Sequence, residues 1–517
     1  MHLPITTAFF PFTLLLPVTL ATHENLKLHN QNHLFNAIHS SMRQWGSSLN
    51  HNGMSFFLAT LSTETQLYHG TSKPQTVTGM EWLAFEPEHA LIFARPQRGL
   101  AQRHGNGLAQ DEKGHEVKRS NPQYPLGSPK ADADAKYGYL HTYVPKRPLH
   151  LLYIDGLSAG KTPNGTLDTQ DMLLLNLTDS NGPMGRELER AHGLCNLTTT
   201  LWQGKIDGIL RMEGGFEIIL CDFATHLQRT DVIRVSAEEP HNGFAAGSGG
   251  WSYLKAVTSR YHGIGGSRVV LDLERFVSVF AYPNIDGLFV NDVQSDYAMP
   301  RLQNVGDSDR LQVRADVTSM ILNKDWSKAR ESQNWQAVAD MVVQRYSKSL
   351  HFLHTSQAVR DDKDALVAYL NQQLRPFIDP ADRDATLETQ RCVAQLVPTL
   401  GSSASLAHLV LYTVTNHICH TLLTALQIAS APQSHMSDRA IELIDKLVGY
   451  LQWTTWKDCG QCTDEEICFI PIWPLGTHKD HAHPQCRSQE QLIRGGYWGS
   501  SRGRRGREWW YEEKWQA

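Results

Sequence analysis

The stretch Leu149-His-Leu-Leu-Tyr-Ile154, together with Phe216-Glu-Ile-Ile-Leu220, indicates the fold of the N-terminal part of the chain. Both stretches are short apolar runs of the length and composition that buried β-strands have. Across residues 34–235 such runs alternate with Gly, Pro and Asn breakers and with helical stretches. We therefore predict an α+β domain over residues 34–235, a mixed fold with small β-sheets.

The pattern changes beyond this domain. The glycine-rich run 243–250 (GFAAGSGG) predicts a loop or hinge, and residues 251–312 are expected to form a mixed α/β region. From residue 313 to 456 the apolar residues recur with helical spacing, which predicts a largely α-helical domain. One expected helix face consists of Trp335, Val338, Val342 and Tyr346, and another of Ile441, Ile444, Leu447, Val448 and Leu451.

The first 21 residues predict a secreted protein. Phe9 to Leu20 (FFPFTLLLPVTL) is an uncharged apolar run that ends in small residues around Ala21. Such a run is too short to cross a bilayer comfortably and is typical of a cleaved signal peptide. The next most apolar stretch, Leu406 to Leu426, contains three histidines and an asparagine, so we expect no membrane insertion.

Composition argues against another class of partner. The formal net charge is -5 over 517 residues, so the chain has no global positive field that would attract nucleic acid. We therefore expect no nucleic acid as a partner, and the sequence identifies no protein partner.

Eight cysteines are present, an even number suited to an oxidising compartment. Local pairing would join Cys195 to Cys221 and Cys392 to Cys419, and would leave four cysteines in a cysteine-rich segment over residues 457–490. The connectivity within that segment cannot be deduced from the sequence. A disordered tail is expected over residues 494–517, which have no periodic apolar face.

The cysteine-rich segment has a second interpretation. Cys459-Gly-Gln-Cys462, with Cys468, Cys486 and three nearby histidines, has enough ligands for a tetrahedral zinc site. Behind a signal peptide these thiols would be oxidised, so disulfides are favoured and no metal ligand is predicted. Three sequons, at Asn164, Asn176 and Asn196, indicate at least one N-linked glycan.

Three blocks of the N-terminal domain carry a chemical pattern. The first is Leu67-Tyr68-His69-Gly70-Thr71-Ser72, the second is Glu81-Trp-Leu-Ala-Phe85 followed by Glu88–Ala94, and the third is Arg211-Met-Glu-Gly-Gly-Phe-Glu217 before an apolar strand. In this order they resemble the signatures of the histidine-type ADP-ribosyltransferase fold, which includes poly(ADP-ribose) polymerases and RNA phosphotransferases. The chain as a whole resembles uncharacterised secreted proteins of filamentous fungi.

The resemblance implies roles for individual residues. His69 would hold the nicotinamide-side ribose through a hydroxyl, with Tyr68, Gly70 and Thr71 forming the same binding strand, and Gly70 letting the backbone approach the ligand. The aromatic residues that would stack on nicotinamide are Trp82 and Phe85. Glu217 would stabilise the positive charge that develops as the nicotinamide bond breaks, with Glu213 as the second candidate. The second block departs from the family in lacking the Tyr, Ser or Thr that the family usually has there.

Two hypotheses of different class follow. In the first, the protein cleaves NAD as a substrate, without a permanently bound cofactor. In the second, it is a non-catalytic, disulfide-stabilised structural or interaction protein, in which His69 is a core residue and Glu217 forms a salt bridge with Arg211. A phosphate-binding loop at Gly156-Leu-Ser-Ala-Gly-Lys-Thr162 is rejected, because it has three residues between its glycines where four are required.

Overall fold

The structure is a computed structural model of the chain. It describes residues 29–50, 52–96, 137–177, 186–236, 248–285, 287–290, 299–327, 333–401, 404–433, 436–492 and 496–498. The predicted signal peptide, most of the glycine-rich run and most of the predicted tail lie outside these residues. Within the tail, Gly496–Trp498 form a short 3-10 turn in which Tyr497 and Trp498 are buried.

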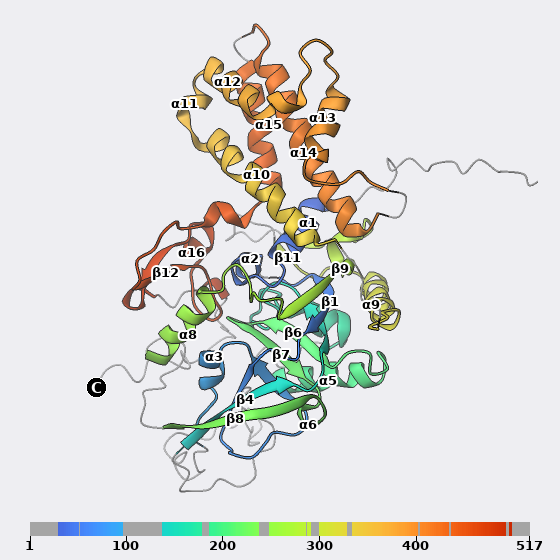
Figure 1. The fold of residues 1–517 in the computed structure, drawn as a ribbon, viewed down its shortest axis with the longest axis vertical. Helices are drawn as coiled ribbons and strands as arrows, with labels where there is room; N and C mark the ends of the chain where they lie inside the picture. The colour runs from blue at the N-terminus through green and yellow to red at the C-terminus, as the bar shows by residue number, and fades with distance from the viewer. Residues whose placement is uncertain are drawn as a thin grey trace, which may run out of the picture.

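A nine-stranded sheet forms the lower half of the molecule (Figure 1). Its order is β8-β4-β2-β3-β7-β6-β5-β1-β9, and all neighbouring strands are antiparallel except β5 and β6, which are parallel. The strands are β1 (Ser55–Leu61), β2 (Leu67–Thr71), β3 (Glu81–Ala84), β4 (Tyr137–Pro145), β5 (Leu149–Ile154), β6 (Gly208–Met212), β7 (Phe216–Leu220), β8 (Leu227–Ser236) and β9 (Val269–Ser278).

The predicted α+β class is confirmed. The two stretches that indicated it are strands β5 and β7, and every residue of β7 is buried, the charged Glu217 included. The N-terminal strands form one large sheet where the sequence predicted small ones, and β9, from the expected middle region, pairs with β1. Two small sheets lie elsewhere, β10 (Phe289–Val290) with β11 (Met299–Pro300), and β12 (Glu466–Phe469) with β13 (Gln485–Ser488).

Short helices surround the sheet. They are α1 (Gln31–Ser40), α2 (Gln44–Leu49), α3 (Pro87–Leu91), the π-helical turn η3 (Thr169–Leu174), α5 (Glu187–Thr199), α6 (Phe223–His226) and α8 (Ser248–Thr258). Helix α1 joins the sheet region to the helical region, because the side-chain amides of Asn32 and Asn36 donate to the backbone carbonyls of Tyr450 and Leu451.

The C-terminal half is largely helical, as predicted, and its helices α10 to α15 lie above the sheet in Figure 1. Its helices are α9 (Asp307–Leu322), α10 (Trp335–Thr355), α11 (Gln357–Arg360), α12 (Lys363–Leu374), α13 (Ala385–Ala394), α14 (Leu406–Ala429), α15 (Met436–Leu451) and α16 (His478–Ala482). Short 3-10 segments are η4 (Val279–Ala281), η5 (Arg375–Phe377), η6 (Thr454–Lys457), η7 (Gln489–Gln491) and η8 (Gly496–Trp498). The expected face of α10 is buried at all four positions, Trp335, Val338, Val342 and Tyr346.

Helix α14 is the one helix among the described residues that is long and apolar enough to cross a membrane. In this structure 61% of its apolar window is buried against the rest of the protein. It packs between α13 and α15, and it presents Val410, Val414 and Ile418 to the core, as the central helix of a bundle does.

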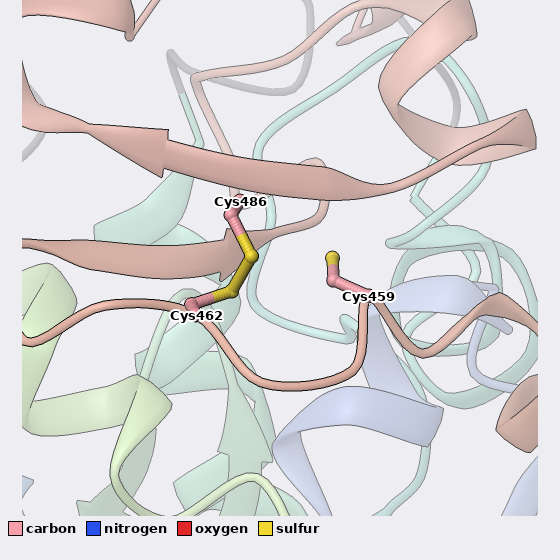
Figure 2. Close-up of side chains that lie close together, drawn as sticks. All are labelled: Cys459, Cys462 and Cys486. Carbon is pink, nitrogen blue, oxygen red and sulfur yellow. A yellow bond between two sulfur atoms is a disulfide. The ribbon is translucent and has the colours of Figure 1, made fainter.

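All eight cysteines form disulfides. The predicted local pairs Cys195–Cys221 and Cys392–Cys419 are confirmed. In the cysteine-rich segment Cys459 pairs with Cys468, and Cys462 pairs with Cys486 across the β12–β13 hairpin; Figure 2 shows the second of these bonds. The first pair ties α5 to the end of β7, so it fixes two elements that border the site described below.

Removing the Cys195–Cys221 bond tests whether this disulfide stabilises the fold. The cysteines are 26 residues apart, and a closed loop of that size restricts the unfolded chain by about 3.5 kcal/mol. We expect the double variant Cys195→Ser/Cys221→Ser to lose about that much free energy of unfolding in urea titrations. The matched control, Cys459→Ser/Cys468→Ser, opens a separation of only 9 residues and should lose about 1 kcal/mol less. Equal stability of the first variant and the wild type would contradict the pairing.

Candidate functional site

One cavity lies on the sheet beside strands β2, β3 and β7, bordered by α3, by the start of α5 and by the loop after β5. It encloses about 560 Å³ of space between the atoms, including its open mouth. Its lining residues are Tyr68, His69, Gly70, Glu81, Trp82, Leu83, Ala84, His89, Ala90, Phe93, Lys161, Glu187, Glu213 and Glu217.

The sheet order explains why residues from distant blocks meet here. Strand β3 lies between β2 and β7, so Trp82 on β3 is flanked by the strand of His69 and the strand of Glu217. Ala84 is the register partner of both Tyr68 and Glu217. The three sequence blocks therefore line a single cavity.

Most of the predicted site residues border this cavity, and two do not. Tyr68, His69, Gly70, Trp82 and Glu217 are lining residues, as is the second candidate, Glu213. Thr71 and Phe85 are absent from the lining; Phe85 is 1% exposed and belongs to the main hydrophobic core.

Gly70 has a packing role that its sequence context did not reveal. A Cβ atom at this position would lie 1.9 Å from the carbonyl oxygen of Ala90 and 2.7 Å from the backbone nitrogen of Ala94. Only glycine therefore allows α3 to pack directly on β2. Because α3 carries His89, this contact also fixes one wall of the cavity.

His69 is held in one tautomer. Its Nδ1 lies 2.8 Å from the backbone carbonyl oxygen of Trp82. A carbonyl can only accept, so Nδ1 carries the proton and Nε2 has the lone pair. Burial lowers the pKa of His69 to about 4, which keeps the ring neutral at pH 7. The buried Nε2 has no hydrogen-bond partner among the described residues.

A fully buried arginine, Arg211, stabilises the acidic wall of the cavity, which consists of Glu187, Glu213 and Glu217. The Nε atom of Arg211 donates to Oε1 of Glu217 at 2.8 Å, Nη1 donates to the amide oxygen of Gln170 at 3.0 Å, and Nη2 is paired with Glu187. Burial alone would raise the pKa of Glu187, but the charge of Arg211, followed by Lys161 and Arg190, holds it well below its ordinary value. The salt bridge between Glu217 and Arg211 that the second hypothesis expected is thus present.

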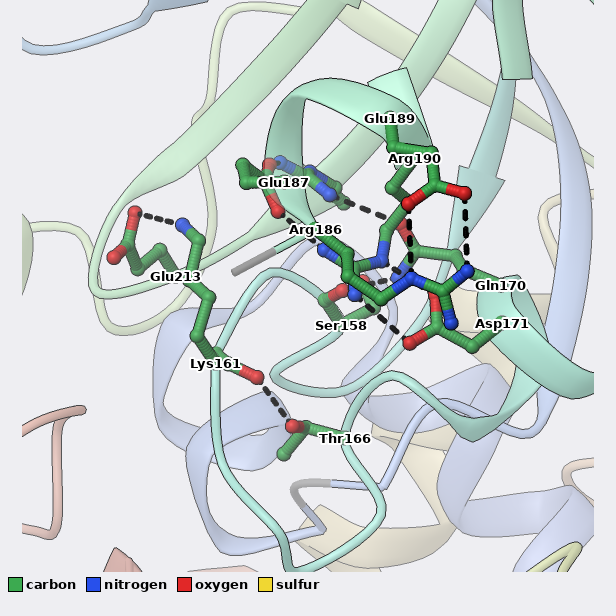
Figure 3. Close-up of polar contacts among 12 residues, drawn as sticks. Ser158, Lys161, Thr166, Gln170, Asp171, Arg186, Glu187, Glu189, Arg190 and Glu213 are labelled. Carbon is green, nitrogen blue, oxygen red and sulfur yellow. Dashed lines mark hydrogen bonds and ion pairs between the residues drawn. The ribbon is translucent and has the colours of Figure 1, made fainter. Parts of the chain in front are cut away.

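Arg190 supports the same wall from α5. Its Nη1 donates to Oε2 of Glu187 at 2.7 Å, and its Nε and Nη2 form two hydrogen bonds with the carboxylate of Asp171. Figure 3 shows Glu187 and Arg190 on the helix, facing Asp171 and Gln170 on η3. Both oxygens of Glu187 are therefore occupied by guanidinium groups.

A second buried ion pair lies at the other side of the wall. Nζ of Lys161 is 2.9 Å from Oε2 of Glu213, and both side chains are almost completely buried (Figure 3). The ammonium group also lies 5.6 Å from the centre of the Trp473 ring. Burial, partly offset by Lys161, raises the pKa of Glu213 to about 7.

The fully ionised wall has an excess negative charge. The buried network contains four carboxylates, those of Asp171, Glu187, Glu213 and Glu217, and three cations, those of Lys161, Arg190 and Arg211. One negative charge is left over. The cavity is therefore suited to a ligand that carries positive charge near these residues.

His89 completes the polar lining. It is 2% exposed, and burial lowers its pKa to about 4. One ring nitrogen of His89 and one oxygen each of Glu213 and Glu217 all lie within 4.8 Å of one another, a spacing from which a metal ion could be bound. Cys459, Cys462 and Cys486 are also close together, but their sulfurs are bound in disulfides and are not thiolate ligands.

Sequence reasoning gave no role to four polar lining residues, Glu81, His89, Lys161 and Glu187. Lys161 stood in the rejected phosphate-loop pattern, and the structure gives it a carboxylate partner instead. The sequence feature that could have indicated Lys161 is its position in the loop that follows the buried strand β5. Glu187 carried no such signal, because a glutamate at the start of a helix is common.

Replacing Arg211 tests the role of the buried network. The change Arg211→Met would leave Glu187 and Glu217 buried with less compensating charge, and we expect a loss of about 3–5 kcal/mol in the free energy of unfolding. The control Lys446→Met removes an exposed pair with Glu442 and should leave the urea midpoint unchanged. Equal stability of the two variants would show that the network does not hold the wall.

The family that the chain matches covers only its N-terminal part. Residues 21–245 match the family described as YPL277C N-terminal domain. The uncharacterized protein YOR389W of Saccharomyces cerevisiae is 35% identical over 221 residues, which cover 39% of this chain and 32% of that protein. The uncharacterized protein YPL277C of the same yeast is 35% identical over 217 residues, covering 39% of this chain and 42% of that protein.

The match thus spans between a third and about two fifths of these relatives' length. No solved structure matches the chain. None of the three descriptions mentions an ADP-ribosyltransferase. Residues 21–245 are similar to an uncharacterised fungal protein family, and the cavity lies mainly within them.

Proposed function

We propose that the cavity binds a nicotinamide nucleotide and cleaves the bond between nicotinamide and ribose, giving NAD hydrolysis or transfer of the ADP-ribosyl group. One observation carries the proposal: His69, Trp82 and Glu217, which come from three separate sequence blocks, line the same cavity. The resemblance assigns these residues to ribose binding, ring stacking and charge stabilisation.

The state of His69 supports a hydroxyl ligand. Its Nδ1 proton is engaged by the carbonyl of Trp82, so Nε2 can only accept a hydrogen bond. A buried acceptor without a partner favours a donor from a ligand, and the ribose of a nucleotide has hydroxyl groups that can donate. Trp82 is half-buried and lines the cavity beside it, and an indole offers the flat aromatic surface on which nicotinamide would stack.

Glu217 would act through its fixed charge. As the bond between ribose C1 and the nicotinamide nitrogen breaks, the electron pair stays on the ring nitrogen and positive charge develops on the sugar. The carboxylate is held by Arg211 before the reaction begins, so little reorganisation is needed to stabilise that charge. Water, or an acceptor group, then bonds to C1 and releases a proton.

Nicotinamide release from NAD tests the proposal. Purified protein should release nicotinamide, and Glu217→Gln, which keeps the shape and an acceptor for Arg211, should lower the rate at least about 100-fold. The control Glu442→Gln changes an exposed glutamate outside the site and should keep the wild-type rate.

Circular dichroism of each variant would confirm folding. Absence of release by the wild type, or equal rates for Glu217→Gln and wild type, would overturn the enzymatic proposal and favour the non-catalytic, disulfide-stabilised protein.

We also propose that the protein is secreted and N-glycosylated, and four disulfides are compatible with the secretory pathway. The sequons differ in accessibility. Asn176 and Asn196 are exposed, whereas Asn164 is half-buried and its side-chain nitrogen donates to the carbonyl of Tyr497 at 2.6 Å.

After expression through a fungal secretory pathway, we expect glycans on Asn176 and Asn196 and none on Asn164. Peptide mass spectrometry after enzymatic deglycosylation would locate them by the mass change of each modified asparagine. A glycan found mainly on Asn164, or none on any sequon, would contradict the prediction.

A further inference from the structure

We propose that His89, Glu213 and Glu217 form a binding site for a divalent transition-metal ion such as Zn²⁺ or Mn²⁺. This inference goes beyond the proposed function, because it does not depend on a nucleotide substrate. One ligand atom from each residue lies within 4.8 Å of the ligand atoms of the other two residues, and all three residues line the cavity.

The three ligands are fixed by different elements. His89 lies on α3, Glu213 lies in the turn between β6 and β7, and Glu217 lies on β7. None is more than 5% exposed. Because each is held by the packing of its own element, the cluster is preformed and is not a chance meeting of flexible surface side chains.

The turn that carries Glu213 is packed closely against α8. The backbone nitrogen of Gly215 donates to the hydroxyl of Tyr253 at 2.7 Å, and the Tyr253 ring lies 4.9 Å from the ring of His89. Tyr253 is 0% exposed. It therefore contacts both sides of the proposed site and fixes the spacing between them.

The buried imidazole of His89 also indicates a bound ligand. Its ring is 2% exposed, and its Nδ1 is buried without a hydrogen-bond partner among the described residues. A buried polar atom without a partner is destabilising, so the unpaired imidazole of His89, which lines the cavity, favours a bound ligand.

The ligand set matches the chemistry of transition metals. One imidazole with two carboxylates suits Zn²⁺ or Mn²⁺ better than Ca²⁺, which prefers only oxygen ligands. Three protein ligands leave a coordination position open toward the cavity, which is typical of sites that bind a further small ligand.

The neighbouring cations would act as outer partners. Arg211 donates to Oε1 of Glu217 and Lys161 pairs with Oε2 of Glu213, so each of the two carboxylate ligands is oriented by a charged group. The wall still has one excess negative charge when all of its groups are ionised, which favours a bound cation.

Metal titration of the full chain tests the site. Protein treated with chelator and then dialysed would be titrated with ZnCl₂ or MnCl₂ by isothermal calorimetry, and we expect one site per chain. His89→Ala and Glu213→Gln should each weaken binding at least about tenfold. The control His192→Ala changes an exposed histidine and should leave this affinity unchanged.

A spectroscopic readout keeps the test independent of stability. Co²⁺ bound by the wild type should give a visible absorption spectrum that His89→Ala lacks. If neither ZnCl₂ nor MnCl₂ binds, or if they bind with the same affinity after both substitutions, the site does not exist. Nicotinamide release measured with and without chelator separates this result from the proposed function, because release without metal binding refutes only the metal site.

Discussion

The buried guanidinium of Arg211 is the interaction on which the cavity depends. It joins Glu217 on β7, Glu187 on α5 and Gln170 on η3, three separate elements of the stretch between residues 169 and 220. A buried arginine is unfavourable unless its charge and donors are all matched, and here two carboxylates and an amide match them. The acidic wall therefore exists only when the sheet, α5 and η3 are assembled together, so the cavity is a property of the complete fold.

The same buried ion pairs determine the chemistry of the acidic wall. Arg190 and Arg211 occupy both oxygens of Glu187, which makes that residue a structural anion. Glu213 pairs with Lys161, Glu217 pairs with Arg211, and both line the cavity. Different ion-pair partners separate the roles of three chemically identical and similarly buried side chains, as differences in environment do in many active sites. Glu213 and Glu217 are the residues that remain for ligand chemistry.

Local sequence patterns predicted a large part of this structure. The apolar runs at β5 and β7, the buried face of α10 and the local disulfide Cys195–Cys221 depend on residues close in the sequence, so their signals are contained in short windows. His69 and Glu217 were found through ordered blocks. His89 and Lys161 were not, because a histidine on a short helix and a lysine in a loop become site residues only through the sheet order β2-β3-β7 and the packing of α3. The pairing within the cysteine-rich segment depends in the same way on the β12–β13 hairpin.

The support of the site extends beyond the residues that match known relatives. The match ends at residue 245, yet Tyr253 accepts a hydrogen bond from Gly215 in the turn after Glu213, and the Trp473 ring lies beside the ammonium group of Lys161. A Cβ atom on Gly214 would lie 3.0 Å from the Ile472 side chain, so the cysteine-rich segment packs directly on this turn. The matched residues supply the chemical groups, while α8 and the disulfide-bonded segment hold two of those groups in place. The position of Glu213 and Lys161 in this chain is therefore set by contacts that the N-terminal part alone cannot make.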